Sequence, residues 1–285
     1  TLANGTSTST TPSDLTLEQG RSYEYAVTYR SPAGVRYRAA PLRVTADWTG
    51  AQTRQVTLEP LLITPATFEQ ALKESAVGDV LELGEGEFIV EQIDLKKDLT
   101  ICGRSRDRTV IRVTKHNIDL RDGRYSFKNC TLLGAIGQNV VHTKNAVVEL
   151  SECVVTVTAS TRSSFGHALW LDKKCKAALR DCQVDAAWVD ENSECILTGC
   201  TVSNPRDDGF VIRNGSSVRI TDSTVSRCKG DGIYLEKGSR LEITESKIVD
   251  NKEAGINMNG NTIGLVVNNC EVSRNAGDGI YLSTG

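Results

Sequence analysis

Residues Gly232–Ala254 read GIYLEKGSRLEITESKIVDNKEA, and this stretch of 23 residues recurs along the second half of the chain. Related copies begin at Ala168, Ala186, Gly209, Gly255 and Gly279. With Gly232 included, successive starting points are separated by 18, 23, 23, 23 and 24 residues. Self-similarity at a nearly fixed period of this length is the signature of a repeat architecture.

Apolar residues alternate with polar ones inside each copy, as in Ile233/Leu235 and Leu241/Ile243. A period of two indicates strands, and the absence of helical spacing excludes repeats built from helix pairs. Three short strands and three turns fit one coil of a parallel β-helix, with equivalent strands stacked about 4.8 Å apart. Because no coil can bury its apolar face alone, the stacked coils together would form the core.

Five of the nine cysteines occupy one position of the coil: Cys130, Cys153, Cys182, Cys200 and Cys270. Ser223 and Ser246 fill the same position in two other coils. A column of free cysteines inside the solenoid fits this pattern, because free Cys behaves as a small hydrophobe. The odd count and the absence of CxxC argue against a disulfide framework or a metal cluster. Unpaired interior thiols favour a reducing compartment such as the cytoplasm, or a shielded core.

Composition excludes two classes of partner. With 33 basic and 36 acidic residues the net charge is -3, so no nucleic-acid or membrane electrostatics is indicated. No apolar run approaches the roughly 20 residues of a membrane span. The sequence starts without Met, and it stops at Gly285 in mid-coil, so we expect a piece of a longer protein or a coil edge covered by another chain.

The first 62 residues differ from the repeats. Residues 1–14 are rich in Ser and Thr and are interpreted as a linker. Residues 15–62 contain strand-like runs at 15–17, 22–30, 35–44 and 54–58, with turn residues at 31–34 and 47–50. This segment resembles the last strands of a PEGA-type or fibronectin-like β-module, which implies a spacing or attachment role.

A helix is expected at Thr64–Lys73, before the first coil. It begins either with Thr64 as cap and Pro65 in the first turn, or with Thr67 as cap and Gln70 closing a capping box. Phe68, Ala71 and Leu72 share one face. Since solenoids need their open ends covered, the helix is interpreted as a lid on the first coil.

The segments that follow the helix read GDVLELGEGEF at 78–88, DLTICG at 98–103 and TVI at 109–111. Together with the helix, this series resembles the opening of pectin-lyase-like right-handed β-helix proteins. That group includes pectin methylesterases and carbohydrate-binding and sugar-hydrolase repeat proteins. The resemblance covers about residues 64–285 and implies an all-β, right-handed parallel β-helix of about eight coils over residues 63–285. One fold hosts many chemistries, so the resemblance does not fix the function.

Strand alternation predicts which side chains face outward on the first strand of each coil. If Ile233 and Leu235 point inward, Tyr234 and Glu236 point outward. One outward column would be Trp170, Trp188, Val211, Tyr234, Asn257 and Tyr281, and the other Asp172, Asp190, Arg213, Glu236, Asn259 and Ser283.

An aromatic stripe beside carboxylates and amides suits a sugar chain. The candidate ligand-binding residues are therefore Trp170, Trp188, Tyr234, Glu236, Asn257 and Asn259. Two other interpretations stay open: loops cover these aromatic side chains, or the column stabilises the strand ladder.

The same face offers a catalytic hypothesis. Asp172 and Asp190 lie on adjacent coils, so their carboxylates should be roughly 5–7 Å apart. One would have a raised pKa and act as an acid while the other stays ionised. Arg213 could hold a substrate carboxylate, and His167 could act as a base. Two acids and an arginine are similar in kind to the pectin methylesterase arrangement. The alternative is a solvated charge ladder in which Arg213 offsets Asp190 and Glu236.

Short acidic turns precede several strands, at residues 207–209 (DDG), 230–232 (GDG) and 277–279 (GDG). A polygalacturonase-like interpretation makes Asp207 and Asp208 catalytic, but the recurrence favours turn chemistry, with Gly supplying a positive φ. Calcium at these acids would be similar to pectate lyases. No dense carboxylate cluster is present, so no cofactor is predicted. His142 is assigned an inward, structural position.

Three functions follow. The first is a non-catalytic module that binds a glycan or a protein partner. The second is an enzyme on acidic polysaccharide (esterase, lyase or epimerase) that uses Asp172, Asp190, Arg213 and His167. The third is a structural solenoid that self-associates end to end through the coil of Tyr281.

Overall fold

The computed structural model describes residues 20–25, 28–32, 34–40, 42–45, 58–135, 137–158, 167–204, 206–236, 238–260 and 262–283. The expected linker at 1–14 and the strand-like run at 15–17 lie outside these residues, as does most of the run at 54–58. The chain divides into two compact units, Thr1–Leu62 and Ile63–Gly285.

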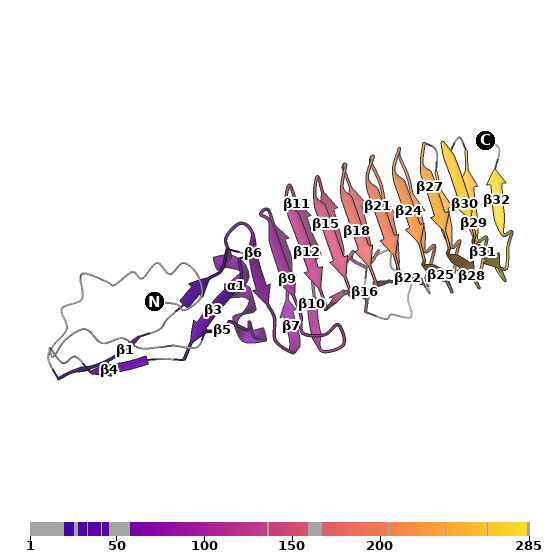
Figure 1. Ribbon diagram of the computed structural model, residues 1–285. Helices are drawn as coiled ribbons and strands as arrows, with labels where there is room; N and C mark the ends of the chain where they lie inside the picture. The colour runs from indigo at the N-terminus through magenta and orange to yellow at the C-terminus, as the bar shows by residue number, and fades with distance from the viewer. Residues whose placement is uncertain are drawn as a thin grey trace. The chain divides into compact units, whose positions relative to one another are not determined.

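Short antiparallel strands make up the described part of the first unit (Figure 1). β1 (Ser22–Tyr25) pairs with β4 (Leu42–Thr45). β3 (Arg36–Ala39) lies between β2 (Thr28–Arg30) and β5 (Leu58–Pro60). The expected runs at 22–30 and 35–44 therefore each contain two strands.

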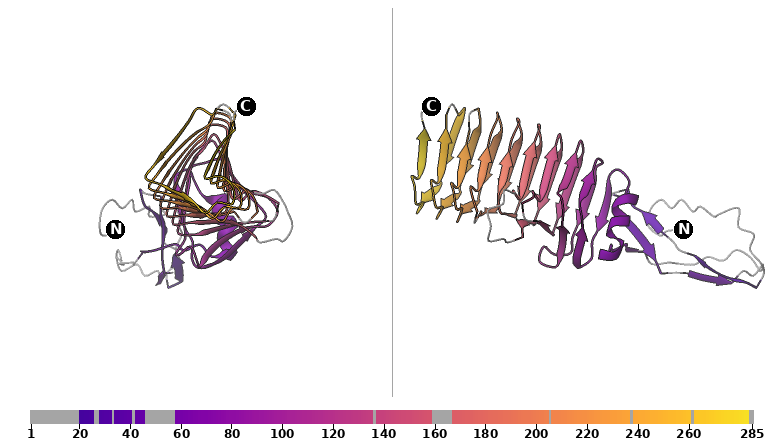
Figure 2. Two further views of the ribbon diagram at one scale, coloured as in Figure 1. Left: turned by 90° about the vertical axis from the view of Figure 1, so that its right-hand side faces the viewer. Right: turned by 180° about the vertical axis from the view of Figure 1, so that it is seen from behind.

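The second unit is a parallel β-helix with three sheets of nine strands each, whose coils lie over one another in the end view of Figure 2. The β6 sheet contains β6 (Asp79–Glu82), β9 (Leu99–Cys102), β12 (Arg124–Lys128), β15 (Val147–Ser151), β18 (Lys176–Arg180), β21 (Glu194–Thr198), β24 (Ser217–Thr221), β27 (Arg240–Thr244) and β30 (Gly264–Asn268). The β7 sheet contains β7 (Gly86–Val90), β10 (Thr109–Val113), β13 (Thr131–Gly134), β16 (Val154–Val157), β19 (Gln183–Val184), β22 (Thr201–Val202), β25 (Thr224–Ser226), β28 (Lys247–Val249) and β31 (Glu271–Ser273). The β8 sheet contains β8 (Ile93–Leu95), β11 (Ile118–Arg121), β14 (Val141–Lys144), β17 (Leu169–Asp172), β20 (Ala187–Val189), β23 (Phe210–Ile212), β26 (Ile233–Leu235), β29 (Ile256–Asn259) and β32 (Ile280–Ser283).

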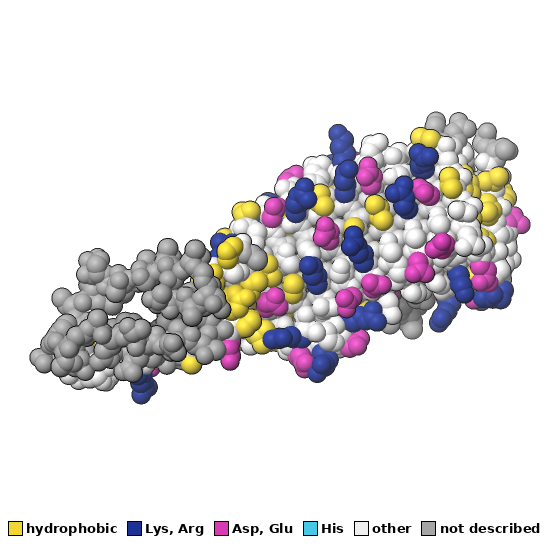
Figure 3. Space-filling model, in the orientation of Figure 1, with side chains coloured by type: hydrophobic (Ala, Val, Ile, Leu, Met, Phe, Trp, Pro, Cys, Tyr) yellow, Lys and Arg dark blue, Asp and Glu magenta, His cyan; other side chains and the backbone are white. Residues whose placement is uncertain are grey.

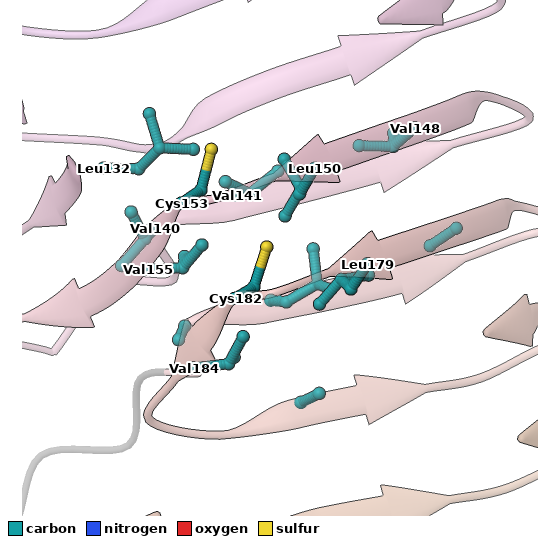
Figure 4. Close-up of a cluster of buried hydrophobic side chains, with 14 of the residues drawn as sticks. Leu132, Val140, Val141, Val148, Leu150, Cys153, Val155, Leu179, Cys182 and Val184 are labelled. Carbon is teal, nitrogen blue, oxygen red and sulfur yellow. The ribbon is translucent and has the colours of Figure 1, made fainter. Parts of the chain in front are cut away.

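The cysteine column lies in the interior, as the spacing predicts. Cys153 and Cys182 are buried on successive coils among Leu and Val side chains (Figure 4). The Sγ atoms of Cys130 and Cys153 are 3.9 Å apart, and all nine cysteines are free thiols. Ser223 continues the column, and its Oγ accepts a hydrogen bond from the backbone N–H of Cys200.

The residue just before this column turns the chain between the β6 and β7 sheets. It has a positive φ in successive coils, at Asn129, Glu152, Asp181, Gly199, Asp222, Glu245 and Asn269. A left-handed residue closes the corner, and Asn and Asp tolerate that conformation better than most residues. The glycines before β23 and β26 have no positive φ, so that expectation was wrong. Close stacking requires them instead: a Cβ on Gly209 would lie 2.7 Å from the carbonyl oxygen of Gly232.

A helical segment covers the first coil, as expected. After Thr64 come a 3₁₀ turn (Pro65–Thr67) and α1 (Phe68–Glu74), and the Thr64 N–H donates to Thr67 Oγ1. Phe68 is buried and packs edge-on against Phe88 with ring centroids 5.2 Å apart. Lys97 Nζ donates to the Leu72 carbonyl oxygen at the end of α1, which fixes the helix on the coil.

The outer face of the β6 sheet is a lattice of opposite charges. Figure 3 shows Lys and Arg interspersed with Asp and Glu over the face in view. Arg219 and Glu242 pair at 2.9 Å across two coils, and both side chains are exposed. Exposed pairs of this kind contribute about 0–1 kcal/mol each, so this face is a solvated surface rather than a site.

Candidate functional site

The outward columns of the β8 sheet have the register that strand alternation predicts. Trp170 pairs with Trp188, Trp188 with Val211, Val211 with Tyr234, and Tyr234 with Asn257. The two tryptophans therefore lie on adjacent coils on one side of the solenoid. Both are half-buried rather than fully covered.

His142 belongs to the same outward column, so its assignment to an inward position was wrong. It pairs with Asp119 on one side and with Trp170 on the other. Its Nδ1 lies 2.9 Å from Asp119 Oδ1, and its ring centroid is 4.8 Å from that of Trp170. The aromatic column is thus one coil longer than the sequence indicated.

Four ring side chains from neighbouring coils form what we call the aromatic panel: His142, Trp170, Trp188 and His167. Trp170 meets Trp188 edge to face, with centroids 5.8 Å apart and an interplanar angle of 88°. His167 stacks on Trp188 at 4.2 Å and 20°. Edge-to-face and stacked contacts are the preferred arrangements of aromatic rings. The panel is therefore packed as a unit, and only part of each indole remains open.

A small cavity of about 120 Å³, which we call the corner cavity, lies at one end of the aromatic panel. It is lined by His167, Trp188, Asp207, Asp208, Val211, Arg213, Tyr234 and Glu236. His167 precedes β17, and the other seven residues come from β20, β23 and β26 or from the segments next to β23 and β26. Five of the ten site residues proposed from the sequence meet here. Asp207 and Asp208, which recurrence assigned to turn chemistry, meet here as well.

His167 is held as a neutral imidazole at neutral pH. Burial lowers the pKa of His167 to about 4, an effect that Arg206 reinforces and the carboxylate of Asp207 partly offsets. The backbone N–H of His167 donates to Asn139 Oδ1, which fixes this residue before β17. A neutral ring in contact with Trp188 can accept a proton or a hydrogen bond.

The pKa of Asp208 is raised, whereas that of His167 is lowered. Its Oδ1 accepts a hydrogen bond from the backbone N–H of Asp231 on the next coil, and a Cβ on Gly230 would overlap this oxygen. Burial raises the pKa of Asp208 to about 7, and the negative charges of Asp207, Asp231 and Glu253 add to the effect. The residue thus serves the turn, as recurrence predicted, and also presents a half-buried carboxyl group to the corner cavity.

The guanidinium group of Arg213 already contacts two neighbouring side chains. Its Nε donates to Glu236 Oε2 at 2.8 Å, and its Cζ lies 5.1 Å from the centroid of the Trp188 ring. An arginine over an indole face makes a cation–π contact. The pairing of Arg213 with Glu236 matches the charge-ladder alternative.

Asp172 and Asp190 turn to separate partners. Asp172 Oδ2 lies 3.8 Å from Lys144 Nζ and 3.7 Å from His142 Nε2. Asp190 Oδ1 accepts a hydrogen bond from Asn214 Nδ2 at 2.6 Å. Each carboxylate is therefore neutralised or hydrogen-bonded by groups outside the pair, and the role of the two as a catalytic pair stays a prediction.

The two asparagines of the proposed ligand face support neighbouring polar groups. Asn257 Nδ2 donates to Asp231 Oδ2 at 2.7 Å, and Asn259 Nδ2 donates to the hydroxyl of Tyr234 at 2.9 Å. Both positions lie beyond the corner cavity, towards β29 and β32.

A larger and more open hollow of about 840 Å³ lies beside α1. Its apolar wall comes from Leu72, Val90, Ile93 and Leu95, and its rim carries both lysines and carboxylates. We place the candidate site at the corner cavity, because five of the site residues proposed from the sequence meet there and none of them lines this hollow. Among the described residues, no group of three or more His, Cys, Asp or Glu side chains could hold a metal ion. No helix in the described part of the chain has the length and apolar character needed to cross a membrane.

Comparison with known proteins defines the class. Residues 116–285 match the family described as "Right handed beta helix region", so the chain belongs to this family and its β-helix is right-handed, as expected. No curated protein sequence matches the chain.

Two solved structures have a fold similar to that of this chain. The A-module of the mannuronan C-5 epimerase AlgE4 from Azotobacter vinelandii is 14% identical, with a TM-score of 0.53 over 76% of this chain and 68% of the other. The pectate lyase Pel9A is 12% identical, with a TM-score of 0.51 over 68% of this chain and 64% of the other. At these identities the similarity shows the fold alone. The chain spans about two thirds of the length of either structure.

Proposed function

We propose that the outer face of the β8 sheet binds a polysaccharide and that the module is not itself catalytic. The observation that carries this proposal is the aromatic panel, which lies directly beside the corner cavity. The parts of the two indoles that remain open can contact the apolar faces of sugar rings, while the polar groups of the cavity fix the orientation of the chain.

The spacing of the coils supports a linear ligand. Equivalent side chains repeat about every 4.8 Å along the solenoid, so a polymer that lies along the axis meets similar groups at each step.

The contacts of the acidic residues support binding rather than the paired-aspartate chemistry. Asp172 is held by Lys144 and His142, and Asp190 is held by Asn214. A general acid and a nucleophile or base need to face the same reacting atoms. These two carboxylates are instead tied to different neighbours.

A second candidate function is an enzyme that acts on the bound polysaccharide. One observation favours it: burial raises the pKa of Asp208 to about 7 and lowers that of His167 to about 4. A proton donor and a free base in one cavity at neutral pH are what acid–base catalysis requires.

The first test is binding of linear polysaccharides of different charge, measured by calorimetry and by tryptophan fluorescence. We expect Trp188→Ala to weaken binding by roughly tenfold or more, since stacking on an aromatic side chain contributes about 0.5–1.5 kcal/mol beyond the buried area. Trp170→Ala should weaken it less. Ile196→Ala is the matched control, because Ile196 is an exposed apolar residue on the β6 sheet.

Unchanged affinity in both tryptophan variants would overturn the binding face. Release of reducing ends or unsaturated products tests the second candidate. If the parent protein forms product and Asp208→Asn or His167→Gln does not, the module is an enzyme and the non-catalytic proposal is wrong.

A further inference from the structure

The corner of the solenoid around Asp208 carries a surplus of negative charge. Arg213 pairs with Glu236 at 2.8 Å, and Arg206 pairs with Asp185 through Nη2 at 3.5 Å, while the buried Nη1 of Arg206 has no hydrogen-bond partner. Four carboxylates at this corner have no ion-pair partner among the described residues: Asp207, Asp208, Asp231 and Glu253. His167 adds no positive charge at neutral pH, because burial lowers its pKa to about 4.

This surplus already acts on Asp208. The charges of Asp207, Asp231 and Glu253 help to raise its pKa to about 7, although burial is the larger cause. A positive charge that enters the cavity would stabilise the ionised form of Asp208, because the cation takes the place of the proton beside the carboxylate.

The walls of the corner cavity favour a particular kind of cation. Trp188 supplies an aromatic surface, and the hydroxyl-bearing ring of Tyr234 lines another part. At about 120 Å³ the cavity is well below the roughly 300–1,000 Å³ of a site for a whole small molecule, so it takes one substituent rather than a ring. Aromatic and carboxylate walls around a small space are the arrangement that binds alkylammonium groups.

We propose that the corner cavity binds the protonated amine of an amino sugar in a glycan that lies across the aromatic panel. This inference rests on the proposed function and names the class of its ligand. The amine would lie beside the carboxylates of Asp207 and Asp208, next to the part of the Trp188 indole that His167 and Arg213 leave open, while the sugar rings extend along the outward column of the β8 sheet.

A uronic acid is the ligand that the charges disfavour. Its carboxylate would approach Asp207 and Asp208, and the arginine that lines the cavity, Arg213, already binds Glu236. Like charges in contact cost affinity and reject the wrong partner. A divalent cation also fits poorly, since the described residues contain no cluster of three ligating side chains.

The test compares three oligosaccharides of equal length by calorimetry at pH 6.5: glucosamine, N-acetylglucosamine and galacturonate hexamers. We expect the glucosamine hexamer to bind about tenfold more tightly than the acetylated one, which has the same rings but no charge. The galacturonate hexamer should bind most weakly. Calcium at millimolar concentration should not change these affinities.

Two variants locate the amine. Asp208→Asn and Asp207→Asn should each reduce the ratio of the affinity for the glucosamine hexamer to that for the acetylated hexamer to about threefold or less. Asp207 is exposed, so its replacement keeps the test valid even if Asp208→Asn fails to fold. Asp107→Asn, at an exposed turn between β9 and β10, is the matched control and should keep the full preference.

The outcomes separate the two proposals. Equal or tighter binding of the acetylated or galacturonate hexamer overturns the amine site but leaves the polysaccharide face standing. A preference that persists in both cavity variants also overturns it. If none of the three hexamers, and no other linear polysaccharide, binds, the proposed function is wrong and this inference is wrong with it.

Discussion

His167 and Trp188 lie face to face, with ring centroids 4.2 Å apart and 20° between the ring planes. The imidazole comes from the residue before β17 and the indole from β20, so the contact joins two successive coils. Because burial lowers the pKa of His167 to about 4, the stacked pair is neutral at physiological pH.

This contact makes the protonation of His167 visible. We expect tryptophan fluorescence to fall as the pH drops through about 4, because a protonated imidazole in contact with indole quenches its emission. Trp188→Phe should remove the transition, and Trp170→Phe should retain it. A transition that survives Trp188→Phe, or one centred near pH 6.5, would contradict the assignment.

The raised pKa of Asp208 predicts how stability changes with pH. The folded chain keeps a proton on Asp208 up to about pH 7, whereas an unfolded chain loses it near 3.8. Between these values the folded state binds more protons, so this residue makes stability fall as the pH rises. We expect Asp208→Asn to gain roughly 1–2 kcal/mol relative to the parent between pH 4.5 and 7.5, after allowance for solvent screening.

Urea denaturation at several pH values measures this difference. Asp207→Asn serves as the reference, because Asp207 is exposed and neighbours the same turn. A constant difference in unfolding free energy between Asp208→Asn and the parent across the range would refute the shift.

Gly230 allows Asp208 to reach the next coil. A Cβ at this position would overlap Asp208 Oδ1 and lie 3.1 Å from the Asp208 backbone nitrogen. We expect Gly230→Ala to destabilise the fold by about 1–3 kcal/mol, as overpacking does, and to weaken ligand binding. Gly264→Ala is the control, since its nearest atom, Arg240 Nε, is 4.0 Å away. Equal effects of the two substitutions would contradict the close approach.

The cysteine column should accept serine. Ser223 and Ser246 already occupy it, and each hydroxyl donates to the carbonyl oxygen two residues earlier. Cys182→Ser can make the same hydrogen bond, so we expect it to cost about 1 kcal/mol or less. Cys182→Leu should cost about 1–3 kcal/mol because it overpacks the column. Thermal and urea denaturation compare the two, and a serine variant less stable than the leucine variant would sink the idea.

Strand alternation alone was enough to place Trp170 beside Trp188 and Tyr234 beside Asn257, because side chains of stacked strands repeat with a period of two. It did not place His142, since the coil that leads to β14 departs from the repeat motif by which the others were aligned. The alignment of residues in a column also does not predict which other side chains each residue contacts. Asp190 binds Asn214 from a turn, and Asp172 meets Lys144 from the preceding coil.

The raised pKa of Asp208 could not be predicted from the sequence. Its recurrence correctly indicated a turn, but a shifted pKa depends on burial and on the charges that the next coils bring close. The useful signal was that two adjacent acids stand where the neighbouring copy has Gly230 and Asp231. An extra carboxylate at a position where two other copies carry glycine, Gly230 and Gly277, is not needed for the bend.

The shortest strands of the solenoid, β19 and β22, have two residues each, and β22 runs directly into the turn that carries Asp207 and Asp208. Because β22 is so short, few ladder hydrogen bonds hold it, and its amides should exchange with solvent at a lower free energy of opening than those of the longer strands. The acidic residues that follow are nevertheless tied to the next coil, since Asp208 Oδ1 accepts a hydrogen bond from the Asp231 N–H. An arriving ligand would therefore meet rings and carboxyl groups at a spacing that the stacked coils set in advance.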